Sequence, residues 1–358
     1  MIHVGVDQKK KYKKCHLPRM NERELPPQAL LGHFRKFFKV KQCLHPLASF
    51  KTCEKVVSAH TIQRKGALEG VVDETGHCLT FSPNDGTDST EPHRRGWQEA
   101  STFPGFCDRH DGVTFSPLET ATFVGLPEQC FLIAYRAQCH ELYQKQAADR
   151  SYEPLRQLLD RGKPPDVQRV IQEAQSWHFA GVRGGLRENR ERKTRMDEDL
   201  LNRNFTGWKR LFIRFKGPMT VVSTGAPTLN RSLSGRELQV LHDLTRRIEP
   251  TYLGLVREEG GGVVVFTWRV EDKAPDEFIS ELRSVSTDLI PGVLVQLMLA
   301  HVENSYFSAT WWNSLTVDQK CHVRQLAQMG NPFYTPWTYM DTLPVPWHVT
   351  DIVESWPG

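Results

Sequence analysis

The feature that most constrains this chain is a set of metal-binding side chains within 68 residues. Cys43 and Cys53 form one pair, and Cys107 and His110 form a second pair some fifty residues later. Zinc prefers four thiolate or imidazole ligands in a tetrahedron, often supplied as two pairs from separate turns. The spacing therefore predicts one structural zinc ion held by these four residues, with His45 as a substitute in the first pair. The alternative is two buried cysteines and a surface histidine.

The other cysteines and the termini limit the class of protein. Eight cysteines in 358 residues are too few for a disulfide scaffold. Cys130, Cys139 and Cys321 lie in apolar, helix-like sequence and are expected in the core. The basic N-terminus lacks the apolar segment of a secretory signal, and no run of about 18 apolar residues predicts a membrane span. We therefore expect a cytoplasmic protein.

Charge is distributed unevenly along the chain. Residues 1–65 contain 15 Lys and Arg but only four Asp and Glu, whereas the rest carries a net charge of −7. A basic end beside a metal cluster favours a polyanionic partner such as nucleic acid, with DNA preferred. The run 9–14 on its own equally suits a solubilising tail.

Local patterns predict the order of the elements in the first half. A basic segment, 1–40, precedes a predicted zinc domain, 41–125. In that domain, strands are predicted at 55–60 and 76–81, a surface loop at 82–96, and a turn at 103–111 that leads into a helix. Apolar residues then recur at helical spacing from Pro127 to Gln146. Residues 126–204 are therefore predicted to be a helical connector, with further helices at 152–161, 166–179 and 181–204.

The second half, 205–358, has the pattern of an α+β domain. Strands are predicted at 210–215, 219–223, 251–256 and 262–270, mostly joined as hairpins, and helices at 277–285 and 291–304. This predicts a mainly antiparallel sheet in a domain that senses a trigger or binds a partner, which could be another protein or a second copy of this chain. The aromatic C-terminus is either packed on its own domain or a surface for a partner or nucleic acid.

Two further residues give the zinc pairs a recognisable context. His60 lies near the end of the first predicted strand, and Asp111 directly follows the second pair. This order resembles the HNH, or ββα-metal, endonuclease family over about residues 41–120. The resemblance implies a treble-clef zinc fold in which a strand with a histidine and its hairpin partner precede a helix.

The resemblance also implies roles for single residues. His60 matches the general base, and Asp111 matches the last motif position, where the family usually has histidine, as a ligand for catalytic Mg²⁺ or Mn²⁺. Arg64, Lys65 and His77 would contact the phosphate backbone. The implied activity is hydrolysis of phosphodiester bonds in DNA, or less favourably RNA, and the architecture suits bacterial defence against phage.

Three departures from the family pattern keep a second function open. Ala59 stands where a second metal ligand often precedes the base, no clear counterpart of the middle Asn exists, and the first knuckle is Cys-x9-Cys. The alternative function is a catalytically inactive, zinc-stabilised module that binds nucleic acid or protein. A third option is an open catalytic zinc with His45 or His60 among its ligands.

Overall fold

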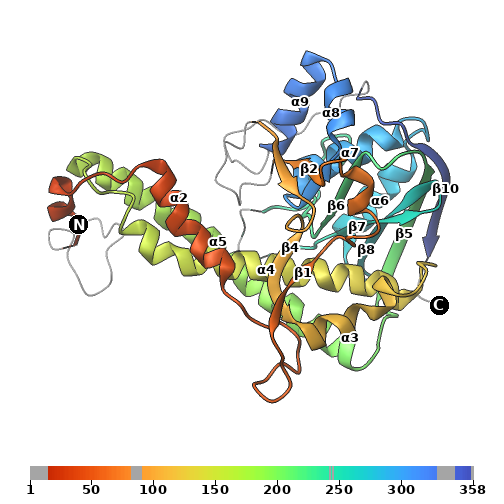
Figure 1. The fold of residues 1–358 in the computed structure, drawn as a ribbon, viewed down its shortest axis with the longest axis horizontal. Coiled ribbons are helices and arrows are strands. Elements are labelled where there is room, and N and C mark those ends of the chain that lie inside the picture. The colour runs from red at the N-terminus through yellow and green to blue at the C-terminus, as the bar shows by residue number, and fades with distance from the viewer. Residues whose placement is uncertain (1–14, 82–90, 242, 244–245, 329–342, 356–358) are drawn as a thin grey trace. The chain divides into compact units, whose positions relative to one another are not determined.

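A computed structural model describes residues 15–81, 91–241, 243, 246–328 and 343–355 (Figure 1). The chain divides into two compact units. The helical unit contains the described residues up to Lys41 and 142–191, and the sheet unit contains the other described residues. The predicted limits at 125 and 204 are not boundaries between these units, because strands from both sides of them share one sheet.

The helical unit contains η1 (Leu17–Asn21), α2 (Pro27–Arg35) and η2 (Lys36–Lys39). It also includes parts of two long helices, α4 (Pro127–Arg156) and α5 (Pro165–Leu201). The predicted helices 166–179 and 181–204 are thus one helix, since Gly181 lowers helix propensity without breaking the turn. Between α4 and α5, Gly162 adopts a φ of +69°, and Pro165 opens α5 as predicted.

The sheet unit is built on eight antiparallel strands in the order β10-β5-β8-β7-β6-β9-β2-β3. The prediction of an α+β fold with a mainly antiparallel sheet is confirmed. The hairpin of β7 and β8 turns at Glu258–Gly261, where Gly260 has a φ of +70°. In chain order the strands are β2 (His77–Thr80), β3 (His93–Gly96), β5 (Trp208–Lys216), β6 (Val221–Gly225), β7 (Tyr252–Glu258), β8 (Gly261–Arg269), β9 (Ser305–Phe307) and β10 (His348–Ser355).

Strand pairing differs from the predicted hairpins in two places. Strands β5 and β6 are consecutive in sequence but do not pair, because β5 lies between β10 and β8 while β6 lies between β7 and β9. Strand β2 pairs with β3 and β9 rather than with the strand that bears His60. Neither β3, β9 nor β10 was predicted, because short or polar strands carry little local signal.

A separate two-stranded sheet precedes helix α3 (Asp108–Glu119). Strand β1 (Val56–His60) was predicted, but its partner β4 (Thr102–Cys107) replaces most of the predicted turn. Gly105 lies in this strand without a positive φ, and a Cβ there would come within 2.0 Å of the Phe103 ring. The glycine therefore makes room for a buried phenyl ring rather than for a tight turn.

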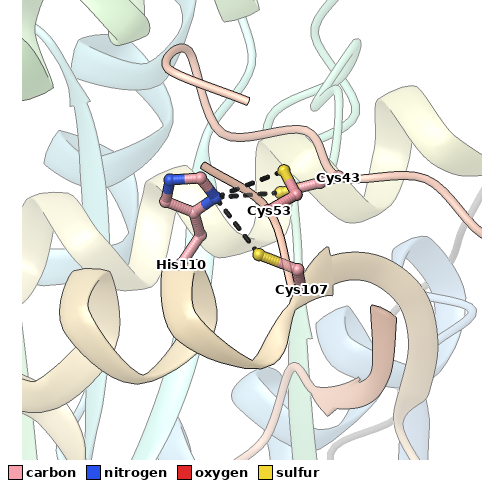
Figure 2. A group of neighbouring side chains, drawn as sticks. All are labelled: Cys43, Cys53, Cys107 and His110. Atoms are coloured by element: carbon pink, nitrogen blue, oxygen red, sulfur yellow. Dashed lines mark hydrogen bonds between the residues drawn. The ribbon is translucent and has the colours of Figure 1, made fainter. Parts of the chain in front are cut away.

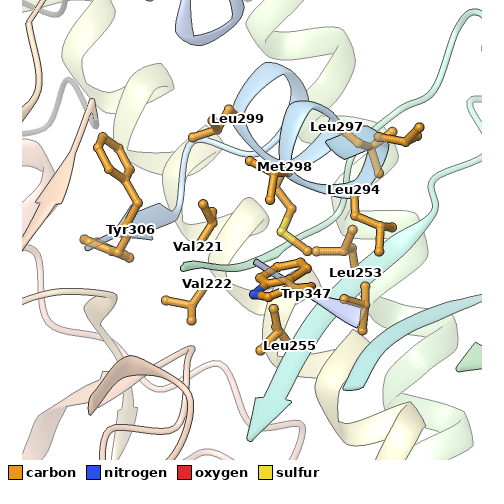
Figure 3. Packing of buried hydrophobic residues seen from close by; sticks show 14 of the residues in the cluster. Val221, Val222, Leu253, Leu255, Leu294, Leu297, Met298, Leu299, Tyr306 and Trp347 are labelled. Atoms are coloured by element: carbon orange, nitrogen blue, oxygen red, sulfur yellow. The ribbon is translucent and has the colours of Figure 1, made fainter. Parts of the chain in front are cut away.

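Helix α7 (Ile290–His301) supplies one side of the main core. Its apolar side chains pack with those of β6 and β7 (Figure 3). Trp347 stacks on Phe215 with 4.1 Å between the ring centroids, and Trp311 and Trp312 are buried. These tryptophans pack on their own domain, whereas Phe333, Tyr334, Trp337, Tyr339 and Trp356 lie outside the described residues.

Three shorter helices complete the sheet unit: α6 (Lys273–Arg283), α8 (Ala309–Ser314) and α9 (Val317–Ala327). Helix α6 buries Phe278, Ile279 and Leu282 in the same core. Each such side chain stabilises the fold by about 1.5–3 kcal/mol. Among the described residues, no helix combines the length and apolar character needed to cross a bilayer.

The three cysteines expected in the core differ in burial. Cys130 and Cys139 of α4 are buried, as predicted, whereas Cys321 on α9 is exposed. The prediction is wrong for Cys321 because a surface helix buries one face only, and this residue lies on the other face.

Candidate functional site

The four predicted zinc ligands meet in the sheet unit. Cys43 and Cys53 come from the loop before β1, Cys107 ends β4, and His110 lies in the first turn of α3 (Figure 2). All four ligand atoms lie within 4.8 Å of one another. The His110 Nδ1 atom is 3.4 Å from the Cys43 Sγ, 3.7 Å from the Cys53 Sγ and 3.2 Å from the Cys107 Sγ. The prediction that these four side chains come together is therefore confirmed, and they could hold a metal ion such as zinc.

These distances fit the dimensions of a zinc site. Bonds of about 2.3 Å to sulfur and about 2.0 Å to nitrogen in a tetrahedron place each sulfur about 3.5 Å from the nitrogen. Burial raises the pKa of the Cys43 thiol to about 11, whereas backbone hydrogen bonds outweigh burial at the Cys107 thiol and lower its pKa. Since zinc binds the thiolate form, these residues can hold a metal ion such as zinc.

Backbone hydrogen bonds fix the loop that carries the first pair. The amides of Gln42 and Leu44 donate to the carbonyls of Pro104 and Gly105, at 3.1 and 2.9 Å. The buried Lys193 ammonium of α5 donates to the Leu44 carbonyl at 2.7 Å. The loop before β1 is thereby held beside β4, so that both ligand pairs face each other.

His45 supports the cluster instead of belonging to it. Its ring stacks on the His110 ring with centroids 4.2 Å apart, and its Nδ1 accepts the Leu47 amide at 3.2 Å. Burial, together with the nearby His110 and Lys193, lowers its pKa to about 4. His45 lies outside the four-residue group, so the structure does not place it among the ligands.

Comparison with known proteins adds nothing to this geometry. The chain matches no family model, no curated protein and no solved structure. The function is therefore inferred from the chemistry of the site.

His60 lies at the end of β1, opposite Thr102 of β4. Its ring donates a hydrogen bond to the Trp97 backbone, whereas its buried Nε2 atom has no partner. Burial is the largest effect on this histidine and gives it a net lowered pKa, so the ring stays neutral near pH 7. A neutral imidazole with a free acceptor nitrogen is the form that a general base requires.

Asp111 and His60 share two charged neighbours, Arg136 of α4 and Glu119 at the end of α3. The Arg136 guanidinium lies 2.7 Å from Glu119 and 3.8 Å from Asp111. Burial raises the pKa of Asp111 to about 6, and Arg136 opposes that shift. Its buried Oδ1 atom accepts no hydrogen bond. The structure thus places two carboxylates beside one buried arginine, whose charge also lowers the pKa of His60.

The described residues do not bring together a complete set of ligands for the predicted catalytic ion. Among the residues that the structure describes, the Cys43 group is the one cluster of three or more closely spaced ligand atoms. The carboxylates of Asp111 and Glu119 are both paired with Arg136, and the buried Oδ1 atom of Asp111 accepts no hydrogen bond.

The predicted phosphate contacts occupy different surroundings. Arg64 is exposed beside Trp97, with its guanidinium 5.5 Å from the ring centroid, and it affects the pKa of His60. Lys65 is exposed beside it. His77 lies on β2, and its Nδ1 atom is 2.9 Å from the Thr75 carbonyl. No contact among the described residues joins His77 to the His60 site, so the structure brings only Arg64 and Lys65 to it.

Sequence reasoning missed the residues that brace this site. Asn304 donates to the Thr61 hydroxyl at 2.7 Å and to the Thr224 carbonyl at 2.9 Å, which fixes the chain after His60 against β6. Arg136 is only 2% exposed. Its position inside the apolar stretch of a predicted helix was a usable signal, because a buried arginine needs a partner.

Proposed function

We propose that this chain is a metal-dependent endonuclease of the HNH type, which hydrolyses phosphodiester bonds in DNA. The observation that carries the proposal is the position of His60: a half-buried ring whose pKa burial lowers and whose Nε2 atom has no hydrogen-bond partner. It stands at the end of β1 and shares charged neighbours with Asp111. A histidine held in this way is suited to take a proton from water.

The metal cluster would give this site its rigidity. A zinc ion on Cys43, Cys53, Cys107 and His110 would join the loop before β1 to the first turn of α3, in the manner of a treble clef. Strand β1 and α3 carry His60 and Asp111 respectively, so the zinc would set the spacing between base and carboxylate. A small two-stranded sheet needs such support because it has little core of its own.

Each residue of the site has a proposed role. His60 would accept the proton of the attacking water. Arg136 lies close enough to Asp111 and Glu119 to hold both carboxylates in place. A divalent ion on Asp111 and Glu119 would neutralise charge that develops at the scissile phosphate. The exposed Arg64 and Lys65 would contact the backbone on either side.

Cleavage of supercoiled plasmid in Mg²⁺ or Mn²⁺ tests this function. His60→Ala should lower the rate by about 10²–10⁴, the usual contribution of a general base. His348→Ala is the matched control, because this exposed histidine lies on β10 and takes no part in the site. Both variants should keep the metal of the Cys cluster. Equal cleavage by wild type and His60→Ala, or none by either in several metals, would refute the nuclease.

Two observations favour the inactive binding module as second candidate. Ala59 occupies the place of a second metal ligand. Among the described residues, Asp111 and Glu119 have no third carboxylate or imidazole close enough to share a metal ion with them. In that case the protein would bind DNA without cutting it, and its affinity would fall steeply as salt rises. A DNA affinity that does not change with salt concentration would exclude this DNA-binding module.

A further inference from the structure

The part of helix α5 that belongs to the helical unit exposes an apolar stripe. Trp177 is 82% exposed and Val170 is 62% exposed, and Val167, Ala174 and Gly181 are exposed as well. These five residues follow one another at intervals of three or four, so they lie on a single face of the helix, which we call the outer stripe. Single exposed apolar residues are common, but a continuous stripe indicates an interaction surface.

The buried face of the same segment is more polar than the outer stripe. Gln168 is buried, and its amide donates to the His16 carbonyl at 3.1 Å. Gln172 is also buried and donates to the Arg156 carbonyl at 2.9 Å. The helix thus uses glutamines to pack on its own unit, while valine and tryptophan face outward. This reverses the usual order of a surface helix and suits a helix that packs on a second molecule.

Gly181 is not explained by the packing of its own unit. It lies inside α5 without a positive φ, and a Cβ at this position would meet nothing within 4 Å among the described residues. Glycine weakens a helix relative to alanine. A glycine that needs neither special backbone geometry nor space within its own chain is suited to the close approach of another helix.

The outer stripe is complementary to a second copy of itself in antiparallel orientation. Its residues occupy the a and d positions of heptads that start at Val167. If Trp177 of one copy lies opposite Ala174 of the other, then Val170 lies opposite Gly181. Each large side chain therefore meets a small one, so the two helices can approach closely. A parallel pair in register would instead place the two Trp177 rings against each other.

The charges beside the outer stripe agree with the same register. Asp166 and Arg187 occupy g positions at the two ends of the stripe, and both are exposed. In an antiparallel pair the g positions of the two copies face each other, which places Asp166 of each copy opposite Arg187 of the other. Glu173, the g residue between them, faces Ala180. This edge therefore brings together opposite charges and no like charges, which favours a second copy as the partner.

We propose that two copies of this chain associate through their outer stripes, with the α5 helices antiparallel. The segment from 166 to 187 is about 32 Å long at 1.5 Å per residue. Each tryptophan buries about 150–250 Å², and a specific interface needs about 1,000 Å² in total. The pair lies near this lower limit, so we expect a dissociation constant of about 1–50 μM. The inference does not depend on the proposed nuclease activity.

Sedimentation velocity of the full chain from about 1 to 100 μM tests this dimer, and wild type should change from monomer to dimer over that range. Trp177→Glu should stay monomeric. Val317→Glu is the matched control and should dimerise like wild type, because this valine is 81% exposed on α9, outside the helical unit. Gly181→Leu should also stay monomeric, because its side chain would fill the space of the second helix. Its urea midpoint should not fall, since leucine favours a helix and meets open space in the monomer.

Charge reversal tests the register. Asp166→Lys and Arg187→Glu should each weaken association at least about fivefold, and the double variant should regain most of the wild-type affinity. Loss of association in Trp177→Glu without recovery in the double variant would overturn the antiparallel register. A wild type that is still monomeric at about 100 μM, or a dimer that Trp177→Glu and Gly181→Leu leave intact, would overturn the whole inference.

Discussion

Replacing Cys107 with serine is the most direct perturbation of the structure. Cys107 is fully buried at the junction of β4 and α3, and its sulfur lies 3.2 Å from the His110 Nδ1 atom. Serine keeps the size of the side chain but removes a thiolate ligand that zinc prefers strongly over a hydroxyl. The change therefore tests the metal and little else.

The expected size of the effect follows from the number of ligands. Structural zinc sites in small peptides have apparent binding free energies of about 10–16 kcal/mol at pH 7, which is about 2.5–4 kcal/mol for each of four ligands. Losing one ligand should weaken zinc affinity by about 10²–10³. The total is comparable to the stability of a whole domain, about 5–15 kcal/mol, so the unit of β1, β4 and α3 should also lose its order.

The assay is metal content and chelator competition on purified protein. Wild type should hold one zinc per chain after dialysis, as expected for a single cluster of four ligands. Cys107→Ser should lose it to a chelator that leaves the wild type loaded. Cys78→Ser is the matched control, because Cys78 is equally buried on β2 but lies outside the cluster. A wild type without stoichiometric metal, or a Cys107→Ser protein with unchanged affinity, would refute the metal site.

Two further predictions concern stability. Gly105→Ala should lower the free energy of unfolding by about 1–3 kcal/mol, since the new Cβ meets the buried Phe103 ring. Gly112→Ala is the control and should not lower it, because a Cβ there meets nothing within 4 Å. Equal urea midpoints for the two variants would contradict this packing effect. In the helical unit, burial raises the pKa of Asp160, but its hydrogen bond and charge interaction with His16 outweigh this, so the net pKa is lowered. Stability should therefore be full above the unfolded value of about 3.9 and decline as pH falls through the lower folded value. Asp160→Asn should make stability depend less on pH in this range and lower the free energy of unfolding by about 3 kcal/mol. If urea unfolding of the variant shows the same pH dependence as wild type, the assigned role of Asp160 is wrong.

The sequence by itself determined the elements with strong local signals. Alternating apolar residues identified β5 and the β7–β8 hairpin, and helical spacing located α4, α6 and α7. The metal cluster was also predictable, because soft ligands at paired spacings have few other uses in a chain with few cysteines. In each case the information lies within a few residues, or in the chemistry of the side chains themselves.

Which segments meet depends on long-range packing. Leu79 of β2 pairs with Phe307 of β9, and Asn304 bonds to Thr61, although each pair is more than 220 residues apart in sequence. Nothing local encodes such partners, because they depend on how buried surfaces fit across the whole sheet. The same holds for Arg136, which became a candidate for function only when α4 placed it beside two carboxylates. The sequence thus supplied the ligands of the metal, and long-range packing supplied the surroundings of His60.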